Sequence, residues 1–231
     1  MATVYLIPAP LHEESIQPIP LYVLDAIKQC NVLFVENERT ARRYLKLFDK
    51  SIVIDNYEWF TIHNAEPQVK QQFLQRIKQN KIIGIISEAG CPGIADPGQL
   101  LIDAAHKAGA TVKPLVGPSS ILLAMMGSGM NGQQFSFIGY LPIDELHRKR
   151  KLQQLEDYSI KQSCTQLFIE TPYRNNQMLD TILKTCKPST KICIAANLTA
   201  PNELIQTKTV EEWKKQKPDL HKQPVIFCLL G

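Results

Sequence analysis

The most constraining feature of this sequence is the alternation of short apolar runs with longer segments of helical period. In the first half, the runs are rich in Val and Ile and apolar on both faces, which is typical of strands buried in a parallel sheet. They are Thr3–Ile7, Val32–Val35, Ile52–Ile54, Ile82–Ile86 and Thr111–Leu115. Strand, helix, strand at this spacing requires crossover connections, so a mostly parallel sheet is predicted.

The intervening segments carry the start and stop signals of helices. Proline lies in or near the first turn of several segments, and Gly109 follows the end of one, as expected for helix termini. The predicted helices of the first half are Ile19–Gln29, Arg39–Phe48, Pro67–Gln79 and Pro97–Ala108.

The second half repeats this rhythm less regularly. Its predicted strands are Phe135–Ile138, Thr165–Ile169, Ile192–Ala195 and Val225–Leu230. Its predicted helices are Ser120–Met126, Glu145–Tyr158, Asn175–Cys186 and Val210–Lys215. With a short joint at Pro114–Pro118, the pattern favours two α/β domains, residues 1–114 and 115–231, with mostly parallel or mixed sheets.

Composition narrows the class of protein. Of 231 residues, 44% are hydrophobic and 21% are charged, which excludes a disordered or fibrous chain. No apolar run approaches the roughly 20 residues of a membrane helix, and no basic leader precedes the first strand, so a cytoplasmic protein is expected. The six cysteines form no zinc pattern and are read as buried free thiols, and no metal site is expected. A net charge of +4 permits a polyanionic partner without requiring one.

The strongest local motif is the loop Ser87–Gly98, S-E-A-G-C-P-G-I-A-D-P-G. It follows a buried strand and precedes a helix, so it belongs to the sheet edge where open α/β folds bind ligands. Its glycines and prolines impose a bent path whose backbone can approach a ligand closely. It is neither a Walker loop nor a dinucleotide fingerprint, and a wide structural turn is the alternative reading.

A second motif, Gly117-Pro118-Ser119-Ser120, precedes an apolar helix. A serine at a helix start is adequately explained as an N-cap. At a joint between two domains, the same hydroxyls and the free helix N–H groups could also face a bound carboxylate.

Several segments resemble, in chain order, motifs of one family. Residues 88–98 resemble the D-A-G-T-P-G-I-S-D-P-G segment of the tetrapyrrole methylase superfamily, and more narrowly its bacterial branch that methylates a cytidine 2′-hydroxyl of small-subunit ribosomal RNA. V-E-N-E-R-T-A-R-R at 35–43 is similar to that branch's A-E-D-T-R-x-x-R-R, and Gly117–Ser120 to its G-P-S-A. F-I-G-Y-L-P at 137–142 is similar to F-x-G-F-L-P, and I-E-T-P-Y-R at 169–174 to Y-E-S-P-H-R.

The resemblance implies a two-domain methyltransferase that binds S-adenosylmethionine in a cleft between the domains, usually as a homodimer. It places the first domain on the substrate side of the cleft, while the second completes the cofactor site. The residues implied as cofactor contacts are Ser87, Glu88, Ala89, Gly90, Cys91, Pro92, Gly93, Ile94, Ala95, Ser119, Ser120, Asn197, Leu198 and Thr199.

Methyl transfer to a ribose hydroxyl benefits from a group that polarises or removes the hydroxyl proton. Glu36 matches the family's acidic position, and His63-Asn64 resembles its H-N pair. Both Glu36 and His63 are therefore catalytic candidates, with Asn64 beside the substrate. The alternatives are that Glu36 caps the following helix or pairs with Arg39 or Arg42, and that His63 is an ordinary surface residue.

Two groups of basic residues suit an RNA substrate. One lies on the helix that starts at Arg39, and the other opens the helix after Pro142. With Tyr140 as a stacking residue, the substrate candidates are Arg39, Arg42, Arg43, Arg148, Lys149 and Arg150. A solvated helix face is the alternative reading of each charge run.

Three departures from the ribosomal branch leave the acceptor open. Residues 9–14 read A-P-L-H-E-E where the branch has T-P-I-G-N-L, the acidic pair becomes Glu36-Asn37, and residues 196–200 read A-N-L-T-A in place of R-E-L-T-K. A tetrapyrrole acceptor is one alternative, although the basic helix after Pro142 argues against it. A non-catalytic relative that still binds the cofactor is the other.

Overall fold

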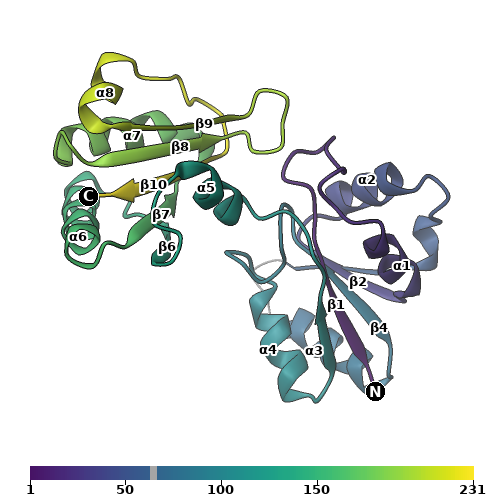
Figure 1. Cartoon of the computed structure of the whole chain (residues 1–231). Coiled ribbons are helices and arrows are strands. Elements are labelled where there is room, and N and C mark those ends of the chain that lie inside the picture. The colour runs from purple at the N-terminus through teal and green to yellow at the C-terminus, as the bar shows by residue number, and fades with distance from the viewer. Residues whose placement is uncertain (63–66) are drawn as a thin grey trace. The chain divides into compact units, whose positions relative to one another are not determined.

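The computed structural model describes residues 1–62 and 67–231. The chain divides into two compact units, Met1–Ser119 and Ser120–Gly231, each with its own sheet and helices (Figure 1). Each unit has a hydrophobic core of its own, and no helix among the described residues is long and apolar enough to cross a membrane.

The first unit is built on a parallel sheet of five strands. They are β1 (Thr3–Ile7), β2 (Val32–Val35), β3 (Glu58–Thr61), β4 (Ile82–Ile86) and β5 (Thr111–Pro114). The strand order is β3-β2-β4-β1-β5, and every neighbouring pair is parallel. The α/β prediction is therefore confirmed, and because neighbouring strands share one direction, all the loops that follow these strands leave from one edge of the sheet.

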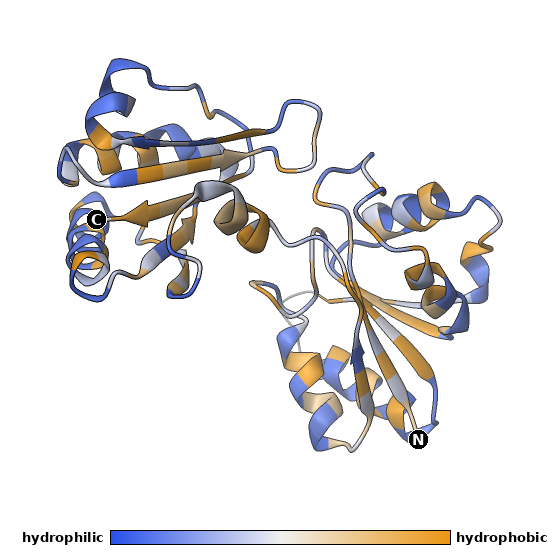
Figure 2. Cartoon of the chain, in the orientation of Figure 1, coloured by the Kyte–Doolittle hydropathy of each residue, from blue (hydrophilic) through white to orange (hydrophobic). Residues whose placement is uncertain are grey.

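Helices cover both faces of this sheet because its strands are apolar on both sides. The helices are α1 (Tyr22–Gln29), α2 (Glu38–Phe48), α3 (Pro67–Lys78) and α4 (Gln99–Lys107). Tyr5 and Ile7 of β1 share a core with α1 and α2, whereas Val4 and Leu6 share one with α3 and α4. Figure 2 shows the resulting hydrophobic strands between helices that are hydrophobic on one side only.

One predicted strand of this unit is wrong. Ile52–Ile54 is not a strand, and Ile54–Asn56 forms a short 3₁₀ helix before β3. The third strand is instead Glu58–Thr61, an edge strand with a half-exposed face. Apolar character alone misled here, because Ile52 is buried from a loop while Val53 is exposed.

The second unit has a mixed sheet. Its strands are β6 (Phe135–Tyr140), β7 (Thr165–Ile169), β8 (Lys191–Ala196), β9 (Leu204–Thr209) and β10 (Val225–Leu230). The order is β6-β7-β10-β8-β9, in which β6 and β7 are parallel and the other pairs antiparallel. β9 was not predicted, because its sequence L-I-Q-T-K-T carries polar residues on a strand that is only half-buried.

Helices also cover both faces of the second sheet. They are α5 (Ser120–Ser128), α6 (Glu145–Gln162), α7 (Asn175–Thr185) and α8 (Val210–Lys215). The core beneath α6, α7 and α8 is anchored by Trp213, whose indole N–H donates to the carbonyl of Ile192 at 2.9 Å. α5 packs on the other face, where Gly127 lies against Ile205.

The loops after β1 and β5 touch at Gly117, which gives a first prediction. A Cβ at this position would lie 2.1 Å from Cβ of Pro8, whose ring cannot rotate away. We expect Gly117→Ala to lower the free energy of unfolding by about 1–3 kcal/mol, because the two loops must separate.

Gly132→Ala is the matched control, since nothing lies within 4 Å of the Cβ it would add. Urea unfolding of both variants checks the prediction. Equal midpoints for the two variants would contradict it.

Candidate functional site

The loops that follow β1 and β4 meet at the carboxyl edge of the first sheet. These two strands are neighbours, but the chain leaves them toward opposite ends of the sheet. β1 connects to β2 on one side, and the adjacent strand β4 connects to β5 on the other side. Such a switch point is where open α/β sheets bind their ligands. Here Ala9 and Gly90 pair through two backbone hydrogen bonds, Ala9 N to Gly90 O at 2.8 Å and Gly90 N to Ala9 O at 3.0 Å. The loop after β1 is thereby joined to the loop after β4.

The loop after β4 is shaped by one carboxylate. Asp96 accepts hydrogen bonds from the N–H of Gly93 at 2.9 Å and from that of Gly98 at 2.7 Å. Gly90 and Gly93 have φ values of +76° and +85°, which favour glycine. Burial raises the pKa of Asp96, while the two N–H donors oppose the rise. The result is a fixed loop with few side chains over its glycines.

Hydroxyl and thiol groups tie the same loop down. The buried Ser87 donates from Oγ to the carbonyl of Gly90 at 3.1 Å. Cys91 lies against the loop after β5, with its Sγ 3.4 Å from the carbonyl of Pro118. Ser119 ends the first unit and Ser120 begins α5 in the second.

Glu36 lies at the end of β2 and faces this loop. Its Oε1 accepts the N–H of Glu88 at 3.3 Å. Partial burial raises the pKa of Glu36, the Glu88 N–H opposes that rise, and the charges of Asp96 and Glu88 add to it. A carboxyl with a raised pKa is suited to accept a proton near neutral pH.

Neighbouring residues fill the two structural roles considered for Glu36, a helix cap and an ion-pair partner of Arg42. Asn37 is the N-cap of α2, because its Oδ1 accepts the N–H of Arg39 at 3.0 Å. Arg42 pairs with Glu38 one turn earlier on the same helix. Asn37, which stands in place of the second acidic residue of the family's motif, therefore caps the helix. The Glu36 carboxylate is directed at the loop after β4.

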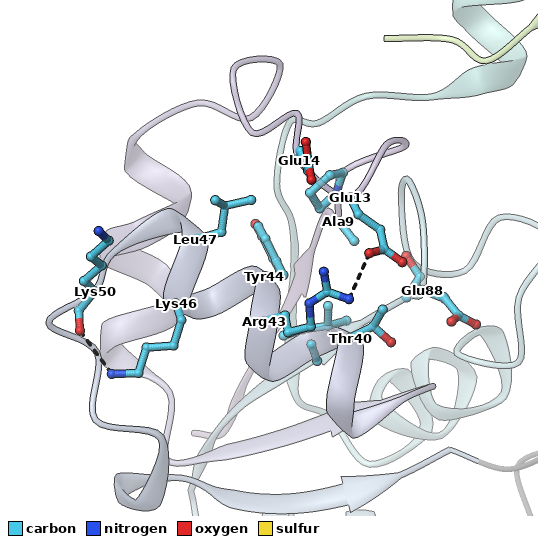
Figure 3. A pocket seen from close by; sticks show the side chains of 14 residues that line it. Ala9, Glu13, Glu14, Thr40, Arg43, Tyr44, Lys46, Leu47, Lys50 and Glu88 are labelled. Atoms are coloured by element: carbon cyan, nitrogen blue, oxygen red, sulfur yellow. Dashed lines mark hydrogen bonds and ion pairs between the residues drawn. The ribbon is translucent and has the colours of Figure 1, made fainter. Parts of the chain in front are cut away.

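Next to this site lies a pocket of about 570 Å³ (Figure 3). Its walls come from the loop after β1, from α2 and from the end of β4. The lining residues are Ala9, Pro10, Glu13, Glu14, Thr40, Ala41, Arg43, Tyr44, Lys46, Leu47, Lys50, Ile86, Ser87 and Glu88. Of the predicted residues, the structure brings Arg43, Ser87 and Glu88 together here.

In the second unit, the predicted residues gather at one edge of the sheet. β6, β7 and β8 end there and β10 begins there, as shown by the pairs Tyr140 with Ile169 and Ala196 with Val225. Tyr140 is exposed and closes this edge on the β6 side.

The segment Asn197–Thr199 lies at the same edge. Asn197 and Thr199 have φ values of +51° and +68°, and Asn197 donates from Nδ2 to Oε1 of Gln223 at 2.7 Å. Leu198 is buried. The buried Oγ1 of Thr199 has no hydrogen-bond partner among the residues that the structure describes. A buried hydroxyl without a partner is costly, so this segment fits a polar group of a ligand.

Sequence reasoning assigned no role to the buried polar residues after β7. The Oε1 of the buried Glu170 accepts from the N–H of Thr171 at 2.7 Å and from Arg174 Nη2 at 2.5 Å. Asn175 is also buried and donates to the carbonyl of Gln223 at 2.6 Å. The E-T-P-Y-R motif could have identified this cluster, because its acid and base are spaced to pair across one turn.

One predicted substrate residue needs correction. Arg148 is only 2% exposed, and its Nη1 donates to the carbonyl of Ile143 at 2.7 Å while Nε and Nη2 lie 3.3 Å from Thr181 Oγ1. It fastens the loop after β6 to α7 and is not free to contact RNA. The basic run that opens α6, H-R-K-R-K at 147–151, is too long to share one face of a helix, and Arg148 falls on the inward face.

The other basic candidates lie at the surface. Lys149 pairs with Glu145 at 2.6 Å, and Arg150 is exposed. Arg39 is exposed, Arg42 covers the Trp59 ring at 5.2 Å, and Arg43 pairs with Glu13 at 3.0 Å. His63 and Asn64 lie outside the described residues. Among the residues that are described, no group of His, Cys, Asp or Glu is arranged to hold a metal ion.

The chain is similar to one family and to several characterised proteins. Residues 4–214 match the family of Tetrapyrrole (Corrin/Porphyrin) Methylases. The chain is 30% identical to ribosomal RNA small subunit methyltransferase I of Vibrio cholerae, over 98% of this chain and 76% of that protein. It is 26% identical to the protein of the same name from Bacillus subtilis, over 92% of this chain and 69% of the relative.

Among solved structures, the methyltransferase CobJ matches with a TM-score of 0.65 and 16% identity, over 100% of this chain and 93% of CobJ. The uroporphyrin-III C-methyl transferase of Thermus thermophilus, complexed with S-adenyl homocysteine, matches with a TM-score of 0.59 and 15% identity, over 99% and 97% of the two chains. At these identities the likeness shows the fold.

The raised pKa of Glu36 gives a second prediction. Because the folded state binds this proton more tightly than the unfolded state, the associated stability is fully present below about pH 4.3 and is lost as the pH rises through the folded pKa. We expect Glu36→Gln, which stays neutral, to gain stability relative to the unchanged protein as the pH rises from about 4 to about 7.

Asp103→Asn is a control of opposite sign. Lys107 lowers the pKa of Asp103, so this variant should lose stability relative to the unchanged protein as the pH rises from about 2 to about 4, with little further change above that. Thermal unfolding at each pH measures both effects. If the stability of Glu36→Gln and that of the unchanged protein changed with pH in parallel, the raised pKa of Glu36 would be ruled out.

Proposed function

Because the chain belongs to the tetrapyrrole methylase family and is an S-adenosylmethionine-dependent methyltransferase, we propose that it methylates a ribose 2′-hydroxyl of small-subunit ribosomal RNA. The chain spans 76% of the length of its Vibrio cholerae relative, which is named for that class of RNA. The observation that carries the proposal is the half-buried Glu36, whose carboxylate accepts the N–H of Glu88 near the start of the glycine loop after β4.

The glycine loop suits the cofactor by its shape. Asp96 holds Gly93 and Gly98 in place, and no Cβ projects from Gly90 or Gly93, so the backbone can contact a ligand directly. We assign Ser87–Ala95 to the cofactor. Ser119 and Ser120 are assigned to it as well, together with Asn197–Thr199, where the unpartnered Thr199 hydroxyl offers a donor.

When bound, S-adenosylmethionine supplies an activated methyl group. A ribose hydroxyl is a weak nucleophile, so the protein must hold its oxygen in line with that methyl group and remove its proton. Glu36 accepts the proton as the new carbon–oxygen bond forms, and a positioned base of this kind contributes about 10² to 10⁴ in rate. His63 is kept as a second candidate for this role, with Asn64 beside the substrate.

Surface cations support an RNA substrate. Arg39, Arg43 and Arg150 are exposed, and the exposed ring of Tyr140 can stack on an unpaired base. Arg42 is paired with Glu38 and Lys149 with Glu145. Arg43 is likewise paired with Glu13, so a phosphate must displace a carboxylate at each of these three cations.

We further propose a cytoplasmic homodimer. The exposed apolar side chains of Ile143 and Leu146 are of the kind that subunit interfaces cover. Light scattering of the purified protein tests this assembly, and the mass of a single chain would contradict it.

A third prediction tests the cofactor site. S-adenosylmethionine at 100 times its dissociation constant should stabilise the fold by about 2.7 kcal/mol, measured as a thermal shift. Gly93→Ala should abolish the shift, because the new side chain strains a backbone with a φ of +85° and displaces the loop. Its Cβ would lie 2.7 Å from Cδ1 of Ile102 on α4.

Gly109→Ala is the matched control. Its φ of +71° imposes similar backbone strain at a position with nothing within 4 Å, so its cofactor shift should equal that of the unchanged protein. Loss of the shift in both variants, or in neither, would count against the glycine loop as the cofactor site.

A fourth prediction tests the acceptor. Ribose methylation of small-subunit ribosomal RNA is mapped in cells with the gene, without it, and with Glu36→Gln. We expect one 2′-O-methyl group to vanish without the gene and to fall strongly with Glu36→Gln, by up to the 10² to 10⁴ of a lost base.

An unchanged methylation map would remove the RNA acceptor. If cofactor binding nevertheless persisted, a different acceptor or a non-catalytic binding role would then account for the site.

A further inference from the structure

The pocket between the loop after β1 and α2, here called the α2 pocket, lies beside the proposed reaction site. It shares Ser87 and Glu88 with the cofactor loop, but neither Glu36 nor the Gly90–Asp96 segment lines it. It belongs to the first unit alone. A ligand in the α2 pocket would therefore sit next to the reacting group and not at it.

The floor of the α2 pocket is apolar and firm. Ala41, Tyr44 and Ile86 are buried there, and Tyr44 Oη donates to the carbonyl of Pro8 at 2.9 Å. That bond fixes the aromatic wall against the start of the loop after β1. A volume of about 570 Å³ lies within the usual range for small-molecule sites and accommodates a planar base with its sugar.

One rim of the pocket is cationic. Arg43 and Lys46 are three residues apart on one side of α2, and Lys50 follows just past the end of the helix. All three line the pocket. Lys46 Nζ donates to the carbonyl of Lys50 at 3.0 Å. Such a row of cations is suited to a phosphodiester backbone.

The protein already holds an anion at this rim. The carboxylate of Glu13 contacts Arg43 at 3.0 Å, and Figure 3 shows the two side chains reaching toward each other. Both side chains are 62% exposed, and exposed ion pairs contribute only about 0–1 kcal/mol. A phosphate can therefore replace this carboxylate at little cost.

Two further carboxylates line the pocket without a cation. Glu14 and Glu88 form no ion pair with any residue that the structure describes. A carboxylate accepts hydrogen bonds from the exocyclic amino group of a base such as cytosine, and it repels the carbonyl that uracil carries instead.

We propose that the α2 pocket holds one nucleotide of single-stranded RNA adjacent to the methylated one, with its phosphate on Arg43 in place of Glu13 and its amino-bearing base against Tyr44 and Glu14. The inference rests on the proposed function and adds a specificity site to it. Glu13 then lowers the affinity severalfold, because it must leave Arg43 when RNA arrives.

Binding of fluorescently labelled oligocytidine and oligouridine to the full chain tests this inference. Arg43→Gln should weaken binding of oligocytidine about tenfold and reduce the salt dependence of binding by about 0.7 per lost phosphate contact. Glu13→Gln should tighten binding severalfold, and Glu14→Gln should remove the preference for oligocytidine over oligouridine.

Lys107→Gln is the control. It also breaks an exposed ion pair, with Asp103 at 2.7 Å, but on a helix that covers the opposite face of the sheet. This variant should bind as the unchanged protein does. All four changes are at the surface, and equal thermal midpoints verify that each variant is folded.

The outcomes separate the inference from the proposed function. If the unchanged protein binds and methylates RNA while Arg43→Gln and Glu13→Gln bind it equally well, the pocket assignment is overturned and the function stands. If Glu13→Gln weakens binding, Glu13 contacts the ligand instead of competing with it, which also overturns the assignment. If the unchanged protein binds the cofactor but no RNA, the proposed acceptor fails.

Discussion

The first unit's site depends on the two backbone hydrogen bonds between Ala9 and Gly90, which join two of its loops. They join the loops that follow two neighbouring parallel strands, β1 and β4, at the point where the connections diverge. The loop after β1 thereby forms one wall of the α2 pocket, and the loop after β4 meets Glu36. Because Gly90 adopts a φ of +76° to make this pairing, the glycine serves the geometry of both loops at once.

Most of the fold could be predicted from patterning. β1, β2 and β4 begin and end where the apolar runs do, because strands buried on both faces contain little else. The failures lie at sheet edges. β3 and β9 are half-buried edge strands with polar residues, so they carry no continuous apolar signal, while Ile52 is buried from a loop and imitates a strand.

The bent backbone of the candidate site could be predicted from a motif. The directions of its side chains could not. The glycines and prolines predicted a bent loop, but nothing in the sequence indicated that Asp96 would hold the N–H of Gly93. The sequence could not tell that Asn37 caps α2 and so leaves Glu36 free of that role, or that Arg148 turns inward to Thr181. The first outcome depends on the residue at which α2 begins, and the second on the rotation of α6 about its axis. A run of charged residues specifies neither.

The placement of β1 also governs the order of assembly. This strand precedes the other four along the chain, yet its neighbours β4 and β5 begin only at Ile82 and Thr111. Contacts this distant along the chain close slowly, so the first unit cannot complete its sheet until nearly all of it has been synthesised. Until then the backbone N–H and C=O groups at the edges of β1 are unpaired and its apolar faces are uncovered, so the strand is open to chaperones or to misassociation. A second unit that contributes no strand to that sheet lets the first finish folding while the rest of the chain is still being translated.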